Sequence, residues 1–127
     1  MKKSGLLHPA LLRAVARLGH THTFVIADCG LPIPRDLEVI DLSLVFGIPR
    51  FVDVVDAILE EVVLEGGIAA EEARGTDVGA WLNDRVESIQ YVPHEELKHL
   101  VRDAEFVVRT GETTSYANVI LRCGVPF

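Results

Sequence analysis

The chain has 127 residues, a formal net charge of −7 at neutral pH, 49% apolar residues and 24% charged residues. This length fits a single domain spanning residues 1–127, and the composition excludes disordered and collagen-like chains. The negative charge, with no basic run longer than Lys2-Lys3, argues against a nucleic-acid-binding protein, which needs a basic surface to displace counterions from phosphates.

Hydrophobic periodicity predicts helices and strands that alternate along the chain. Apolar residues at helical spacing predict a first helix from Leu7 to Leu18, which Gly19 ends. The apolar run at residues 23–27 predicts a strand buried on both faces, and the proline-rich stretch at 31–34 predicts an extended loop. The other predicted elements are a strand at 39–42, a helix at 51–62, a strand at 64–70, a helix at 77–86, a strand at 88–92, a helix at 93–101, and strands at 105–109 and 119–123.

This interleaved series predicts an α/β fold, with helices layered on a largely buried sheet. Cys29 and Cys123 are the only cysteines, and two thiols in a chain of this size do not indicate a disulfide framework. The N-terminal lysines and leucines resemble the start of a signal peptide, but His8 and Pro9 interrupt the apolar run and no cleavage site follows. No segment reaches the length of a membrane span. We therefore expect a cytoplasmic protein without a membrane partner.

Two polar residues flank the first buried strand. His20 follows the glycine that ends the first helix, and an unperturbed imidazole, which titrates near ~6.5, can exchange protons at cellular pH. Asp28 follows the strand at its carboxyl end, where ligands gather in α/β folds, and it could accept hydrogen bonds from a histidine or a sugar hydroxyl. The alternatives are a capping or surface histidine and a turn aspartate.

A metal site is a further alternative at these positions. His20 and His22 would face the same way on a strand and could ligate a metal together with Asp28. No further ligand stands near these residues in the sequence, so we expect no metal site here.

His94, Lys98 and His99 lie on one predicted helix. The two histidines are five residues apart, whereas the zinc-protease motif needs them four apart on one helical face. His94 and Lys98 are four apart and share a face, so they could grip a polar ligand or form a solvated surface.

Tyr116, Ala117 and Asn118 precede the last predicted strand. A phenol and an amide suit polyols, whose hydroxyls both donate and accept, although such residues also occur in ordinary loops. The sequence has no phosphate-binding glycine loop, dinucleotide fingerprint, nucleophile elbow or paired-cysteine zinc spacing. These features fit a reaction that needs only proton transfer and no cofactor.

Taken together, four blocks of sequence resemble the ribose pyranase family, which is related to the fucose mutarotases. In chain order they are Arg17-Leu18-Gly19-His20-Thr21, Asp28-Cys29-Gly30-Leu31-Pro32-Ile33-Pro34, His94-Glu95 with Lys98, and Arg109-Thr110-Gly111-Glu112 running into Tyr116-Ala117-Asn118. The blocks extend over almost the whole chain. The block with two prolines is the most specific, and it favours the ribose branch over the fucose branch.

The resemblance implies that His20 is the proton donor. It also implies a set of residues that bind the sugar, namely Asp28, His94, Lys98, Tyr116, Ala117 and Asn118. The fold that it implies is a three-layer α/β/α domain with a mixed sheet. The resemblance also implies homo-oligomeric rings, commonly decamers of two pentamers, with sites shared between neighbouring subunits.

The sequence departs from the family pattern at position 22. The family usually has an acidic residue there, whereas this chain has His22. If that carboxylate orients His20, we expect activity, sugar preference or pH optimum to differ. The stretch at 73–87 is also a few residues short, in what we expect to be a surface segment.

The activity that the resemblance implies is the interconversion of ribopyranose and ribofuranose. A proton leaves the anomeric hydroxyl, another reaches the ring oxygen, and the open aldehyde recloses through a different hydroxyl. A positioned acid–base group typically contributes about 10²–10⁴-fold, and no metal or redox cofactor is needed. The expected partner is a small neutral monosaccharide. The alternatives are a fucose-type mutarotase that exchanges anomers, a non-catalytic sugar-binding accessory protein, and a metal-dependent protein.

Overall fold

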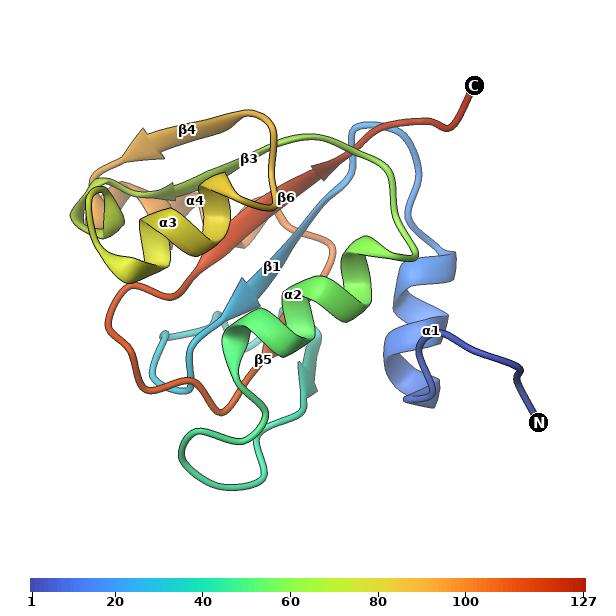
Figure 1. Cartoon of the computed structure of the whole chain (residues 1–127). Coiled ribbons are helices and arrows are strands. Elements are labelled where there is room, and N and C mark those ends of the chain that lie inside the picture. Colours follow the sequence, from blue (N-terminus) through green and yellow to red (C-terminus); the bar gives the residue numbers. More distant parts are fainter.

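The computed structural model describes residues 1–127 and contains a six-stranded sheet with helices on both faces (Figure 1). The helices are α1 (Pro9–Ala16), α2 (Phe51–Leu59), α3 (Asp77–Asn83) and α4 (His94–Leu100). The strands are β1 (Thr23–Ala27), β2 (Val39–Asp41), β3 (Leu64–Ala70), β4 (Ile89–Val92), β5 (Val107–Arg109) and β6 (Val119–Cys123). Two short 3₁₀ helices follow β3 and α4, at Glu71–Ala73 and Val101–Asp103. No helix is long and apolar enough to cross a membrane.

The sheet is mixed, with strand order β2-β5-β1-β6-β3-β4. β1 pairs parallel with β5, β5 with β2, and β3 with β4, whereas β6 runs antiparallel to both of its neighbours. Five strands therefore end at the same edge of the sheet, which we call the carboxyl edge, and β6 begins there. The opposite edge, where those five strands begin, is the amino edge. Ligands of open α/β sheets bind beyond the carboxyl ends of the strands.

Alternation along β1 divides the core into two layers. Phe24 and Ile26 pack into a hydrophobic cluster with α1, α2 and α3, whereas Val25 and Ala27 face a smaller cluster with α4. All four side chains are fully buried, as the sequence predicts for a strand covered on both faces. In Figure 1, α2 runs across the near face of the sheet, with α1 and α3 on the same side. The predicted three-layer α/β/α fold is confirmed.

Every predicted helix and strand is present, and the differences lie at the ends. α1 starts at Pro9, because the imidazole of His8 caps it by accepting the Leu11 backbone N–H at 3.3 Å. α3 ends at Asn83 rather than at residue 86, where the chain closes a turn through hydrogen bonds to the Leu82 carbonyl. Such shifts at element ends are usual, since terminal turns leave the regular helix first.

Candidate active site

Asp28 and Asn118 form a reciprocal pair at the carboxyl edge. The Asn118 side-chain N–H donates to Asp28 Oδ2 at 2.9 Å, and Asn118 Oδ1 accepts the Asp28 backbone N–H at 2.9 Å. The Gly30 backbone N–H donates to Asp28 Oδ1 at 2.9 Å. Asn118 is only 1% exposed, and both ends of its amide are occupied. The carboxylate of Asp28 is thus held in one orientation and keeps lone pairs for hydroxyl donors.

His94 and Tyr116 form a second pair at the same edge. Their rings meet edge to face, with centroids 5.2 Å apart and planes at 77°. The His94 backbone N–H donates to Glu72 Oε2 at 2.9 Å, which fixes the first residue of α4. The Nδ1 atom of His94 is buried and has no hydrogen-bond partner. Because buried polar atoms are nearly always paired, this nitrogen is available to a ligand hydroxyl.

The backbone at Tyr116 is strained. Its φ of 64° lies in the left-handed region that large side chains rarely adopt. The Tyr116 carbonyl accepts the Asn118 N–H at 2.8 Å, so the same turn joins the two pairs of the edge. The only other non-glycine residue with positive φ is Thr21, at 69°, directly after His20. Strain of this kind concentrates at functional sites, and here both cases adjoin residues predicted to act on the sugar.

Two other predicted binding residues are placed differently. Ala117 is completely buried in the larger hydrophobic cluster, so only its backbone can face a ligand. Lys98 pairs with Glu95 at 2.7 Å and lines a cavity of about 540 Å³ together with Pro32 and Arg102. No other predicted site residue lines that cavity. Lys98 lies on α4 four residues after His94, and its ammonium is paired with Glu95.

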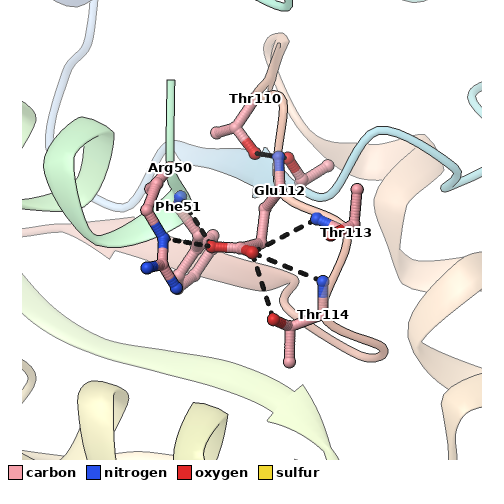
Figure 2. Close-up of polar contacts among 7 residues, drawn as sticks. Arg50, Phe51, Thr110, Glu112, Thr113 and Thr114 are labelled. Carbon is pink, nitrogen blue, oxygen red and sulfur yellow. Dashed lines mark hydrogen bonds and ion pairs between the residues drawn. The ribbon is translucent and has the colours of Figure 1, made fainter. Parts of the chain in front are cut away.

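A buried carboxylate, Glu112, lies in the loop between β5 and β6 and contacts the start of α2 (Figure 2). Its Oε1 accepts the Phe51 backbone N–H at 3.1 Å and lies 3.7 Å from Arg50 Nε. Its Oε2 accepts the backbone N–H groups of Thr113 and Thr114 at 3.2 and 3.3 Å, and the Thr114 hydroxyl at 3.1 Å. Glu112 is 2% exposed, so these donors replace water almost completely. The carboxylate joins the start of α2 to the loop that carries Tyr116.

The same residue also secures the turn after β1. The Glu112 carbonyl accepts the Cys29 backbone N–H at 3.0 Å, next to Asp28. Burial alone would raise the pKa of the Glu112 carboxyl, but hydrogen bonds from Phe51 and from the two threonines hold this pKa below its usual value of 4.5. Glu112 is therefore an ionised part of the scaffold around the carboxyl edge.

His20 lies at the amino edge of the sheet, between α1 and β1. Its Nε2 contacts Glu65 Oε1 at 2.5 Å, and Glu65 Oε2 lies 3.2 Å from Arg122 Nε. β1 has five residues, which span roughly 17 Å at ~3.3 Å per residue, and it separates His20 from Asp28. Within one chain, Asp28 does not orient His20. The sequence-based hypothesis of that contact holds only if the two edges belong to different subunits.

His22 makes contacts of its own. Its Nδ1 accepts the Gly19 backbone N–H at 3.0 Å, and its Nε2 lies 4.0 Å from Glu105 Oε1. His20 and His22 therefore turn toward different carboxylates. The chain has no group of three or more His, Cys, Asp or Glu side chains arranged to hold a metal ion.

Sequence reasoning did not assign roles to Glu65, Glu72 or Glu112. Glu112 stands in a sequence block that resembles the family, but nothing in that block indicates a buried carboxylate. Glu65 and Glu72 acquire their partners only when the chain folds, since those partners are distant in sequence.

The fold is that of a small α/β protein whose carboxyl edge carries a carboxylate, an imidazole and a phenol. The chain matches the RbsD / FucU transport protein family over residues 1–126 and belongs to that family. It is 60% identical, over the full length of both chains, to a D-ribose pyranase of Cutibacterium acnes, and 54% identical over the full length to one of Corynebacterium glutamicum.

Solved structures show the same relation. The structure of Bacillus subtilis RbsD complexed with D-ribose aligns over 100% of both chains, with a TM-score of 0.94 and 45% identity. A fucose mutarotase from Streptococcus pneumoniae in complex with L-fucose aligns over 94% of both chains, with a TM-score of 0.79 and 25% identity. The chain is thus more similar to the ribose-bound relative than to this fucose mutarotase, as the block with two prolines predicts.

Proposed function

We propose that this chain has D-ribose pyranase activity, interconverting the pyranose and furanose forms of D-ribose by general acid–base catalysis. The observation that carries the proposal is the carboxyl edge, where an oriented Asp28 carboxylate lies with the unpartnered Nδ1 of His94. Full-length identity of 60% to a D-ribose pyranase supports the same activity.

In this mechanism the carboxyl edge holds the sugar. Asp28 accepts hydrogen bonds from sugar hydroxyls, and Asn118 keeps its carboxylate oriented. His94 accepts or donates through Nδ1, and Tyr116 offers a ring face and a hydroxyl. His20 protonates the ring oxygen while the anomeric hydroxyl gives its proton to solvent water. The open aldehyde then recloses through another hydroxyl, which returns a proton to His20. One positioned acid–base group contributes about 10²–10⁴-fold, which suits a reaction that already occurs slowly in water.

The two halves of this site come from different subunits in our proposal. His20 lies at the amino edge, and the sugar-binding pairs lie at the carboxyl edge. An amino edge docked on the carboxyl edge of a neighbour completes the site. Such a head-to-tail contact uses two different surfaces and produces a closed ring when the rotation between subunits permits it. The ring assembly implied by the family resemblance, pentamers paired into a decamer, fits this arrangement.

An apolar loop beside the carboxyl edge supports the assembly. Between β2 and α2, four large apolar side chains are exposed: Leu44 by 77%, Val45 by 57%, Phe46 by 85% and Ile48 by 54%. The loop is fixed to the edge, since the Gly47 N–H donates to the Gly111 carbonyl and the Gly111 N–H to the Pro49 carbonyl. Rigid, clustered apolar exposure of this kind marks a protein-interaction surface. We assign it to the neighbouring copy of the chain.

We also propose that the protein works in the cytoplasm. Cys29 and Cys123 are present as free thiols, which suits a reducing compartment.

The activity is tested by NMR saturation transfer between the ring forms of D-ribose, with L-fucose measured in parallel. We expect faster pyranose–furanose exchange with ribose, and loss of that acceleration in His20→Ala and Asp28→Asn. Anomer exchange on fucose without a change of ring size in ribose would instead identify a mutarotase. Saturable ribose binding without any change of exchange rate would identify a binding protein. Glu60→Gln, at an exposed position beyond α2, is the matched control and should retain full activity.

A further inference from the structure

The imidazole of His20 has one close side-chain partner in the structure, the carboxylate of Glu65. Nε2 and Oε1 lie 2.5 Å apart, so the two side chains are hydrogen-bonded. Both side chains are about half exposed, 49% for His20 and 40% for Glu65, so the contact lies at the surface of the chain. In the proposed assembly this surface, the amino edge, docks on a neighbouring subunit. Two positions after His20 the chain has a histidine, His22, rather than a carboxylate.

Glu65 reaches His20 because of an irregularity in β3. The pairing of β3 with β6 shifts register between Leu64 and Gly66, which leaves Glu65 at a β-bulge. A bulge re-aims a side chain out of the regular alternation of a strand and is frequent near functional sites. On the neighbouring strand, Arg122 pairs in register with Gly66 and contacts Glu65 Oε2 at 3.2 Å. His20, Glu65 and Arg122 thus form a chain of three groups, with the carboxylate in the middle.

We propose that Glu65 is a positioning residue that fixes the tautomer of His20. Arg122 forms an ion pair with one carboxylate oxygen. A carboxylate can only accept, so its other oxygen accepts the Nε2–H of the imidazole. The imidazolium form then donates its Nδ1 proton to the ring oxygen of the sugar, and the neutral ring that remains keeps its hydrogen on Nε2 and accepts a proton back at Nδ1. The same logic, with the ring nitrogens exchanged, applies where an aspartate orients the histidine of a catalytic triad. This inference depends on the proposed role of His20 as the acid.

The proposal gives His22 a separate role. Its Nδ1 accepts the Gly19 N–H and thereby closes the turn before β1. The carboxylate partner of His20 comes from β3, so a histidine at position 22 is compatible with full activity.

The decisive variant is Glu65→Gln. Arg122 would hold the amide oxygen, because it has no acceptor to offer the amide nitrogen, so the NH₂ group would face His20 Nε2. That nitrogen must then accept, which places the proton on Nδ1 and inverts the tautomer. We expect kcat for ribose to fall roughly 10–100-fold, less than the about 10²–10⁴-fold of a whole acid–base group because the imidazole remains in place, while KM changes less than about twofold. Glu65→Asp retains a carboxylate and should keep the Nε2–H tautomer with an intermediate kcat.

The tautomer is read directly from long-range ¹H–¹⁵N correlations of the five histidines at alkaline pH, with His20→Ala identifying the His20 signals. The matched control is Glu38→Gln, which removes a carboxylate that forms an ion pair with Arg13. The Glu38 side chain is 42% exposed, nearly the same as the 40% of Glu65. This control should leave the tautomer and kcat unchanged.

The outcomes separate the two claims. An inverted tautomer and a lower kcat in Glu65→Gln, with neither change in Glu38→Gln, support the positioning role. If the hydrogen of the neutral His20 ring stays on Nε2 in Glu65→Gln, the positioning role is wrong, whatever the activity. If His20→Ala remains fully active, the proposed acid is wrong, and the tautomer measurement still decides whether Glu65 fixes the imidazole. Thermal unfolding of each variant shows whether the fold is retained. If Glu65→Gln does not fold, Glu65→Ala, which removes the acceptor, takes its place, and a wild-type His20 with its hydrogen on Nδ1 overturns the proposal in any case.

Discussion

Replacing Glu112 by glutamine changes the buried carboxylate in the loop between β5 and β6 while keeping its shape. The carboxylate accepts four hydrogen bonds, three of them at Oε2. The amide oxygen of a glutamine would keep those three, and its NH₂ group would then face the Phe51 N–H and Arg50. Two donors would point at each other in a site that is 2% exposed.

The cost follows from these contacts. A buried donor without an acceptor costs about 1–3 kcal/mol, and each bond that loses its charge assistance weakens by roughly 1 kcal/mol. Because neighbouring bonds are not additive, we expect a loss of about 3–5 kcal/mol in the free energy of unfolding. That is a large share of the roughly 5–15 kcal/mol that stabilises a typical domain. At roughly 4 °C per kcal/mol, Tm should fall by about 12–20 °C.

The pH dependence gives the same prediction a second test. The pKa of Glu112 in the folded protein is lowered below 4.5, so its contribution is complete above that value and is lost as the pH falls through the folded pKa. The difference between wild type and Glu112→Gln should therefore be full at pH 7 and shrink below pH 4.5. Urea unfolding at fixed protomer concentration measures it, with the exposed Glu60→Gln as control. A loss below 1 kcal/mol at pH 7, or a difference that persists unchanged in acid, would refute the reasoning.

Three further changes test other parts of the structure. Asn118→Ala removes the two Asn118 contacts to Asp28 and leaves the one from Gly30. KM for ribose should therefore rise roughly tenfold, the equivalent of one charge-assisted hydrogen bond, and unchanged ribose kinetics would contradict this role. Gly111→Ala would place a Cβ 2.4 Å from the Ile48 carbonyl oxygen, so thermal unfolding should show a loss of about 1–3 kcal/mol, and wild-type stability would disprove the close approach. Burial raises the pKa of the Cys123 thiol, so a thiol reagent at pH 8 should label this cysteine only after unfolding; rapid labelling of the native protein would count against its burial.

The order of elements could be predicted from the sequence because most of them carry a clear periodic signal. β1 is an unbroken apolar run, and α2 repeats apolar residues at helical spacing, so local pattern and tertiary burial agree. Element ends were less predictable. α3 ends three residues before Val86, where hydrogen bonds to the Leu82 carbonyl close a turn. No residue type at that point indicates the end of the helix.

The site was predictable only in part. Asp28 and Asn118 could be singled out because each adjoins a buried strand, but their mutual contact depends on the pairing of β1 with β6 across 90 residues. The partner of His20 could not be found, since Glu65 has no sequence signal and reaches the imidazole only through a β-bulge. That His20 and Asp28 lie at opposite edges follows from the strand between them, and it changes the site from one within a chain to one between chains.

A mixed oligomer tests this arrangement most directly. His20→Ala and Asp28→Ala subunits, each expected to be inactive alone, are co-expressed, and ribose ring exchange is measured by saturation transfer. If each site takes an imidazole from one subunit and a carboxylate from its neighbour, about one quarter of the sites in a random mixture carry both intact groups, and activity returns to about that fraction of wild type. Mixed oligomers as inactive as the single variants would contradict a site built between two subunits.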